Sequence, residues 1–194
     1  MLIFIVAYNA EKTIQQVLRR IPVDQMPRET DVLVIDDASS DLTFRAAEAY
    51  RKEEGDLNIT VLYNPDNQGY GGNQKLGYAY AIEHGYDVVA LVHGDGQYAP
   101  EKLPELIKPV LDGEADACFG SRMIERGAAL TNGMPRYKYV GNKILTWFEN
   151  FFLGTDLSEF HSGYRIYSVP ALAEIPFRHN TNDFHFDTDI IIQF

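Results

Sequence analysis

Three polar side chains alternate directly after an apolar stretch of the chain. His93, Asp95 and Gln97 follow residues 88–92, and a glycine separates each from the next. An apolar run without alternation is typical of a strand buried on both faces, and ligands of open α/β sheets bind at the carboxyl ends of such strands. If the strand conformation continues, the three side chains offer one nitrogen and two oxygen ligands to a metal beside a diphosphate. The alternative is a tight turn with polar tips.

Two adjacent carboxylates end an earlier apolar stretch. Asp36 and Asp37 follow residues 31–35. Adjacent carboxylates repel each other unless hydrogen-bond donors or a cation offset their charge, and a ribose and a base supply such donors. The alternative is that an aspartate caps the following helix, which suits Asp41 better than the pair.

A glycine-rich loop precedes the third predicted helix. Gly69, Gly71 and Gly72 resemble a phosphate-cradling loop at a helix start, although glycines are also common in ordinary turns. The loop lacks the dinucleotide-binding fingerprint GxGxxG, because Gln74 stands in the place of the third glycine. No Walker lysine motif is present either.

A guanidinium and two ionisable groups occur together later in the chain. Glu159 and His161 lie shortly before Arg165, whose planar fork of donors suits a diphosphate. His161 is alternatively a structural histidine. Residues 183–187 gather carboxylates and aromatic rings before a last helix, which Asp187 is expected to cap.

The polar and glycine-rich clusters described above follow predicted strands, and the strands alternate with predicted helices. Apolar runs predict strands over residues 2–7, 31–35, 59–63, 88–92 and 115–120. Helical patterns cover residues 11–20, 43–54, the glycine loop to about 84, and 100–111. The alternation predicts an α/β fold with a mainly parallel central sheet and helices on both faces. We therefore expect the polar clusters to converge along one rim of the sheet.

The chain changes character after residue 122. Residues 125–136 resemble a mobile lid whose Arg126 and Arg136 either close over phosphate or are solvated loop charges. Residues 137–153 form an unusually aromatic helix around Trp147. We favour a core helix, with an apolar platform for a lipid acceptor or a membrane surface as the alternative.

Composition limits the partners. The 194 residues, 45% of them hydrophobic, suffice for one domain over residues 1–194, and a net charge of -11 disfavours nucleic acid. The single cysteine, Cys118, forms no internal disulfide and indicates a reducing compartment. No signal peptide precedes the first strand and no run reaches the roughly 20 apolar residues that span a bilayer. We expect a cytoplasmic protein, truncated after Phe194.

Together these motifs resemble the family 2 glycosyltransferases with the GT-A fold, most closely the branch that includes dolichol-phosphate mannosyltransferase. The resemblance covers essentially the whole chain. It rests on Ala7-Tyr8-Asn9 with Glu11, Asp36-Asp37-Ala38-Ser39 with Asp41, residues 67–73, residues 93–97, Gly120-Ser121-Arg122 and Ser162-Gly163-Tyr164-Arg165.

The resemblance implies an inverting, metal-assisted transfer of a hexose from a nucleoside diphosphate sugar, with UDP or GDP, to a polyprenyl phosphate or a saccharide. The residues expected to hold the donor are Ala7, Tyr8, Asn9, Glu11, Asp36, Asp37, Ser39, Gly69, Gly72, Asn73 and Arg136. Asp95, Gln97 and His93 are expected to hold Mg²⁺ or Mn²⁺. Arg122 and Arg165 are expected to neutralise phosphate charge in catalysis.

Two departures from the family pattern matter. His93 stands where the DxD motif has its first aspartate. This replacement weakens Mg²⁺ binding, favours Mn²⁺, or leaves His93 outside the metal's first coordination shell. The general base is also undecided among Asp156, Glu159 and His161. A lipid phosphate is already anionic and needs no base, so we favour a polyprenyl phosphate acceptor and contact with the cytoplasmic face of a membrane.

Two other functions remain as alternatives. A non-catalytic module that binds a sugar nucleotide or a glycan would fit the replacement of an aspartate by His93. An NAD-dependent dehydrogenase shares the parallel sheet, but the failed glycine fingerprint argues against it.

Overall fold

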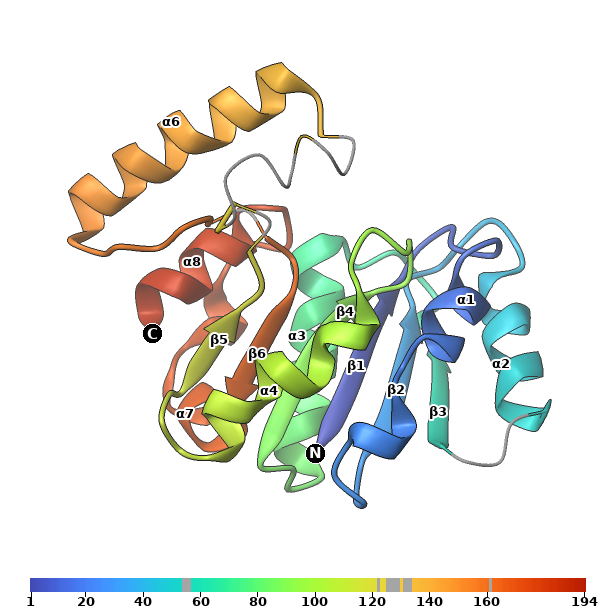
Figure 1. Cartoon of the computed structure of the whole chain (residues 1–194). Coiled ribbons are helices and arrows are strands. Elements are labelled where there is room, and N and C mark those ends of the chain that lie inside the picture. Colours follow the sequence, from blue (N-terminus) through green and yellow to red (C-terminus); the bar gives the residue numbers. More distant parts are fainter. Residues whose placement is uncertain (54–56, 122, 125–129, 131–133, 161) are drawn as a thin grey trace.

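The computed structural model describes residues 1–53, 57–121, 123–124, 130, 134–160 and 162–194, and a six-stranded sheet forms its centre (Figure 1). The strands are β1 (Leu2–Ala7), β2 (Asp31–Asp36), β3 (Asn58–Tyr63), β4 (Val88–His93), β5 (Ala117–Phe119) and β6 (Arg165–Ser168), in the order β3-β2-β1-β4-β6-β5. Strands β1 to β4 are parallel, whereas β6 runs antiparallel to both β4 and β5. The predicted α/β class and mainly parallel sheet are confirmed.

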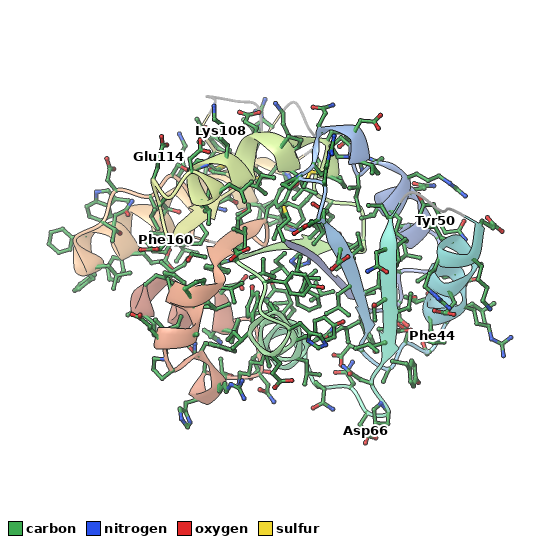
Figure 2. All side chains as sticks on the ribbon, turned by 90° about the horizontal axis from the view of Figure 1, so that it is seen from below. Phe44, Tyr50, Asp66, Lys108, Glu114 and Phe160 are labelled. Atoms are coloured by element: carbon green, nitrogen blue, oxygen red, sulfur yellow. The ribbon has the colours of Figure 1, made fainter. Side chains whose placement is uncertain are left out.

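Helices cover both faces of this sheet. They are α1 (Ile14–Arg19), η1 (Val23–Gln25), α2 (Thr43–Glu53), α3 (Tyr70–Glu83), η2 (Pro100–Lys102), α4 (Leu103–Leu111), α6 (Arg136–Leu153), α7 (Val169–Glu174), η3 (Phe177–His179) and α8 (Phe186–Gln193). Alternate residues of β1 supply two separate cores, because side chains along a strand point to opposite faces. Ile3 and Ile5 pack with α1, α2 and α4, and Leu2 and Phe4 pack with α3, α7 and α8. Figure 2 shows α4, marked by Lys108, on one side of the sheet and α3 on the other.

The rim at the carboxyl ends of β1 to β4 is the upper edge of the sheet in Figure 1. The antiparallel direction of β6 places its first residue, Arg165, at this same rim rather than at the opposite edge. Residues far apart in the chain therefore meet there, as expected from the strand and helix pattern.

Helix α6 is the element that differs most from its prediction. The favoured core interpretation is wrong: Trp147 is 66% exposed and Phe151 is 72% exposed, and Thr146 is the buried residue of the helix. Helix α6 stands apart from the two helical layers, beyond the carboxyl rim (Figure 1). Among the described helices, none combines the length and apolarity that crossing a bilayer requires.

Candidate active site

The loops after β1 and β2 are locked together by hydrogen bonds. The Asn9 amide donates to Ser39 Oγ at 2.8 Å, and the Ser40 amide donates to Asn9 Oδ1 at 3.0 Å. The Ala10 amide donates to Thr43 Oγ1 at 2.7 Å. Asn9 adopts φ 50°, a left-handed conformation that asparagine tolerates better than most residues. The two loops thus form one surface, from which Tyr8 projects with 56% of its area exposed.

A second contact joins the same loops. The Glu11 amide donates to Asp41 Oδ2 at 3.1 Å, and the Thr43 amide donates to Asp41 Oδ1 at 3.0 Å. Asp41 therefore stands before α2 as a capping residue, as anticipated. Burial raises the pKa of Asp41, but the hydrogen bonds from Thr43 and Glu11 outweigh burial and hold the pKa below its ordinary value.

Asp36 and Asp37 are buried and find their hydrogen-bond donors within the chain. Asp36 Oδ1 accepts from the amide and the hydroxyl of Ser39. Asp37 Oδ1 accepts from Asn64 Nδ2 and the Gln68 amide, both at 2.8 Å, and Asp37 Oδ2 accepts from the Gly69 amide at 3.1 Å. Groups of the chain itself thus supply the donors that were expected from a ribose and a base, and they offset the repulsion between the two carboxylates. The pair shapes the loops of the rim.

The glycine loop has the geometry of a tight turn rather than a phosphate cradle. The Gly71 amide donates to the Asn182 carbonyl at 2.7 Å, and the Gly72 amide donates to the same oxygen at 3.4 Å. A Cβ on Gly69, which has φ +80°, would lie 2.8 Å from that carbonyl oxygen. Asn73 is buried and donates to the Ile35 carbonyl at 3.1 Å. The amides of Gly71 and Gly72 are thus engaged, and the glycines let residues 181–186 approach.

Asp95 lies on an exposed turn directly beyond β4. The Gly94 amide donates to the Val6 carbonyl at 2.9 Å, and Thr13 Oγ1 donates to the Gly94 carbonyl at 2.7 Å, so the turn is fixed against β1 and α1. Asp95 Oδ1 accepts from the Gln97 amide at 3.0 Å, and both side chains are exposed. A carboxylate and a carboxamide are therefore available at the rim.

His93, unlike that pair, is packed into the protein. Its ring packs between those of Tyr70 and Tyr98, with centroids 5.7 Å and 5.1 Å away. Its buried Nε2 has no hydrogen-bond partner among the described atoms, and a Cβ on Gly163 would lie 2.3 Å from it. Burial lowers the pKa of His93, against the opposing charge of Asp95. The alternative that leaves His93 outside a metal's first shell fits this geometry.

Arg165 is the centre of a buried network instead of an exposed phosphate ligand. Its side chain is 1% exposed. Nε donates to the Ser162 carbonyl, Nη1 to Tyr167 Oη and the Asp187 carbonyl, and Nη2 to the Phe160 carbonyl. Nη2 also lies 3.4 Å from Asp187 Oδ2. An arginine has five N–H donors; four of them make these hydrogen bonds, and the charge is paired with the Asp187 carboxylate.

Asp187 is a residue whose role the sequence analysis misjudged. It does not cap α8, because its carboxylate accepts from Tyr70 Oη at 2.7 Å and from Gln74 Nε2 at 3.1 Å. Burial, together with the charge and hydrogen bond of Asp187, raises the pKa of Tyr70. The spacing of the sequence gives no sign of this contact, since it joins residues more than a hundred positions apart.

Three further predicted site residues lie within the described part of the chain. Glu159 is 2% exposed and accepts from Asn142 Nδ2 at 3.0 Å, whereas Asp156 is exposed. Arg136 is exposed at the start of α6. Arg122, Arg126 and His161, with most of the predicted lid, lie outside the described residues. Among the described residues, no three His, Cys, Asp or Glu side chains gather at a point that could hold a metal.

The candidate site lies at the carboxyl rim of a mainly parallel sheet, where ligands of open α/β proteins bind. The chain is a member of glycosyl transferase family 2, whose model matches residues 2–175. The resemblance inferred from the motifs is thereby confirmed, and the dehydrogenase alternative is excluded.

Individual relatives point to the same branch of the family. Undecaprenyl-phosphate mannosyltransferase of Micrococcus luteus is 33% identical over an alignment of 178 residues that covers 90% of this chain and 68% of that protein. Polyprenol monophosphomannose synthase of Mycolicibacterium smegmatis is 28% identical, and the alignment covers 90% of this chain and 63% of that protein. These names agree with the expected dolichol-phosphate mannosyltransferase-like branch.

Solved glycosyltransferase structures share the fold. A mannosyltransferase from Pyrobaculum calidifontis, in complex with GDP-Man and Mn²⁺, has a TM-score of 0.64 at 20% identity over 97% of this chain and 51% of its own. Glucosyl-3-phosphoglycerate synthase from Mycobacterium tuberculosis has a TM-score of 0.69 at 21% identity over 98% of this chain and 63% of its own. The expected GT-A fold is confirmed. The chain spans 51% to 68% of the lengths of these four relatives.

Proposed function

We propose that this protein transfers a hexose from a nucleoside diphosphate sugar to a polyprenyl phosphate. The observation that carries the proposal is the exposed Asp95 carboxylate beyond β4, at the rim where the loops after β1 and β2 interlock. Ligands of open α/β sheets bind at this edge. Family membership supplies the reaction class, and the relatives named for undecaprenyl phosphate and polyprenol supply the acceptor.

The donor is a UDP- or GDP-hexose, held by the exposed parts of the interlocked loops. Tyr8 offers an exposed ring on which a base can stack, and Asn9 and Glu11 offer exposed polar groups next to it. Asp36, Asp37 and Ser39 act on the donor indirectly, because their side chains hold the loops in place.

The residues at the rim fit a divalent cation that is shared with the donor. Mg²⁺ is commonly held by one or two carboxylates together with substrate phosphates, so a single protein carboxylate suffices. Asp95 would bind Mg²⁺ or Mn²⁺, and Gln97 supplies a second oxygen from the same turn. The cation would stabilise the charge of the departing nucleoside diphosphate.

The acceptor phosphate acts as the nucleophile. One of its oxygens forms a bond to the anomeric carbon of the hexose as the bond from that carbon to the diphosphate oxygen breaks, which inverts the anomeric centre. Because the acceptor is anionic, no proton has to be removed. This agrees with the buried position of Glu159, whose carboxylate is engaged by Asn142.

Isothermal titration calorimetry with UDP- and GDP-hexoses tests donor binding. Donors of one of the two nucleotide classes should bind in the presence of Mn²⁺. Their affinity should fall at least tenfold when a chelator removes the metal. Asp95→Asn should remove this metal dependence without altering thermal unfolding, because the side chain is exposed. The matched control is Asp112→Asn, an exposed aspartate at the end of α4. Absence of binding by every donor would remove the proposal, and binding without transfer would leave a non-catalytic sugar-nucleotide module.

A further inference from the structure

Helix α6 is amphipathic, but its orientation is the reverse of that in an ordinary surface helix. A surface helix normally turns its apolar stripe to the core and its polar stripe to water. In α6 the polar stripe faces the protein. Asn142 Nδ2 donates to Glu159 at 3.0 Å, and Asn150 Nδ2 donates to the Leu157 carbonyl at 2.8 Å. Thr146, between these asparagines on the same face, is the buried residue of the helix.

The opposite side of α6 carries a continuous apolar surface, which we call the aromatic face. Its members are exposed and follow helical spacing: Val140, Ile144, Trp147, Phe148, Phe151 and Phe152. With about 3.6 residues per turn, these positions lie opposite the stripe of Asn142, Thr146 and Asn150. The rings contact one another, with centroids 6.1 Å apart for Trp147 and Phe151 and 4.6 Å apart for Phe148 and Phe152. Clustered rings of this size at a surface indicate a non-aqueous partner.

The charge of α6 identifies the kind of partner. The chain carries a net charge of -11, yet the exposed charged side chains of this helix, Arg136, Lys138 and Lys143, are all basic. The acidic residue of the helix, Glu149, is half-buried and has an interaction partner. Helical spacing places the three basic residues along the borders of the aromatic face, not in its centre. Basic residues beside an apolar, tryptophan-containing face are typical of helices that lie in the plane of an anionic membrane surface.

We infer that the aromatic face of α6 docks the protein onto an anionic lipid bilayer, with α6 lying flat in the interface. The inference deepens the proposed function and rests on it for the choice of a lipid partner over a protein. Helix α6 lies beyond the carboxyl rim that carries Asp95 (Figure 1). A bilayer on the aromatic face would therefore adjoin the rim where a lipid phosphate has to reach the donor. The asparagine stripe fastens α6 to residues 157–159, so the helix docks as part of the folded protein.

The only tryptophan of the chain, Trp147, reports on this contact directly. Its fluorescence should shift to shorter wavelength when purified protein is mixed with phosphatidylglycerol vesicles, and stay unchanged with phosphatidylcholine vesicles. Binding should weaken as salt is added, because the electrostatic part is screened. Equal binding to both vesicles would contradict the anionic preference, and no shift with either would overturn the inference.

Paired variants separate the contribution of the basic residues of α6 from that of its aromatic face. Lys138→Glu/Lys143→Glu should weaken co-sedimentation with phosphatidylglycerol vesicles more than tenfold, since each basic residue near such a surface contributes roughly a fivefold factor. The control is Arg28→Glu/Lys52→Glu, the same charge change at exposed positions outside α6. Phe148→Ser/Phe151→Ser should abolish the shift of Trp147, whereas Leu111→Ser/Ile192→Ser, at exposed apolar positions on α4 and α8, should not.

Light scattering without lipid tests the competing occupant, which is a second copy of the chain. A stable dimer that Phe148→Ser/Phe151→Ser converts to a monomer would assign the aromatic face to self-association and overturn the lipid inference. The calorimetric test of donor binding is performed without vesicles, so its result does not depend on whether α6 binds lipid. Vesicle binding without donor binding would contradict only the proposed function, and the reverse would contradict only the docking of α6.

Discussion

The exposed carboxylate of Asp95 and the buried carboxylates of Asp36, Asp37 and Asp187 show how differently one residue type is used in this protein. Asp95 is held by one amide of its own turn and is otherwise open. The buried aspartates are surrounded by donors from the chain itself, which is the usual condition for burying a charge. Asp36, Asp37 and Asp95 all lie at the ends of strands, so sequence position alone did not separate the buried carboxylates from the exposed one.

Gly163 is the residue against which His93 packs. In Gly163→Ala the new methyl group would lie 2.3 Å from His93 Nε2, so the ring or the strand must move. Overpacking of this kind costs about 1–3 kcal/mol, which urea denaturation will measure. The control Gly141→Ala, on α6 with open space around the added carbon, should leave stability unchanged or raise it slightly. Equal effects of the two substitutions would show that His93 is not confined.

Asp41 should titrate below its ordinary pKa of 3.8, because the hydrogen bonds from Thr43 and Glu11 outweigh the effect of burial. A lowered pKa in the folded state means that the carboxylate contributes stability fully above the ordinary value. That contribution is lost as the pH falls through the lower, folded-state value. Carbon-detected NMR titration of the Asp41 carboxyl group measures it, and a midpoint at or above 3.8 would contradict the bonding described between the two loops.

Among the elements, the agreement with the sequence analysis follows from periodicity. Strands β1 to β5 and the helices α2, α3 and α4 were predicted within a few residues, since apolar runs and helical spacing are local signals. Helix α1 is shorter than expected at its start, because residues 11–13 belong to the turn that joins the loops of the rim. Helix α6 was misjudged because periodicity shows that one face is apolar without showing whether that face meets the protein.

The Arg165–Asp187 pair connects β6, α3 and α8 and should dominate their stability. Arg165→Met leaves the Asp187 carboxylate buried beside Tyr70 and removes the donors to three backbone carbonyls. Breaking a buried pair in this way costs about 3–5 kcal/mol in the free energy of unfolding. The control Arg20→Met breaks an exposed pair with Glu101 and should cost less than about 1 kcal/mol.

A double-mutant cycle separates the pair from the rest of its network. Adding Asp187→Asn to Arg165→Met should recover part of the loss, because the uncompensated charge is then absent. Strictly additive effects of the two substitutions would show that the guanidinium acts through the carbonyls alone.

At the scale of the whole molecule, the sheet brings strand-end loops to one rim, and α6 lies beyond that rim (Figure 1). The residues of its aromatic face are exposed. The fold and the convergence of loops could be predicted, because parallel strands with short crossovers leave few topologies. The details of the site could not. Which carboxylate is open, where His93 points and what Arg165 holds depend on contacts between loops that are distant in sequence.

The most direct measurement follows a labelled hexose from its nucleotide into lipid. With the nucleotide class selected by calorimetry, Mn²⁺ and polyprenyl phosphate, the label should appear in the organic phase. Asp95→Asn should reduce that rate at least a hundredfold, a loss of about 2.7 kcal/mol in transition-state stabilisation, while Asp112→Asn keeps it. Label that remains in water in the presence of bound donor, or an Asp95→Asn variant as active as the unaltered protein, would contradict the account.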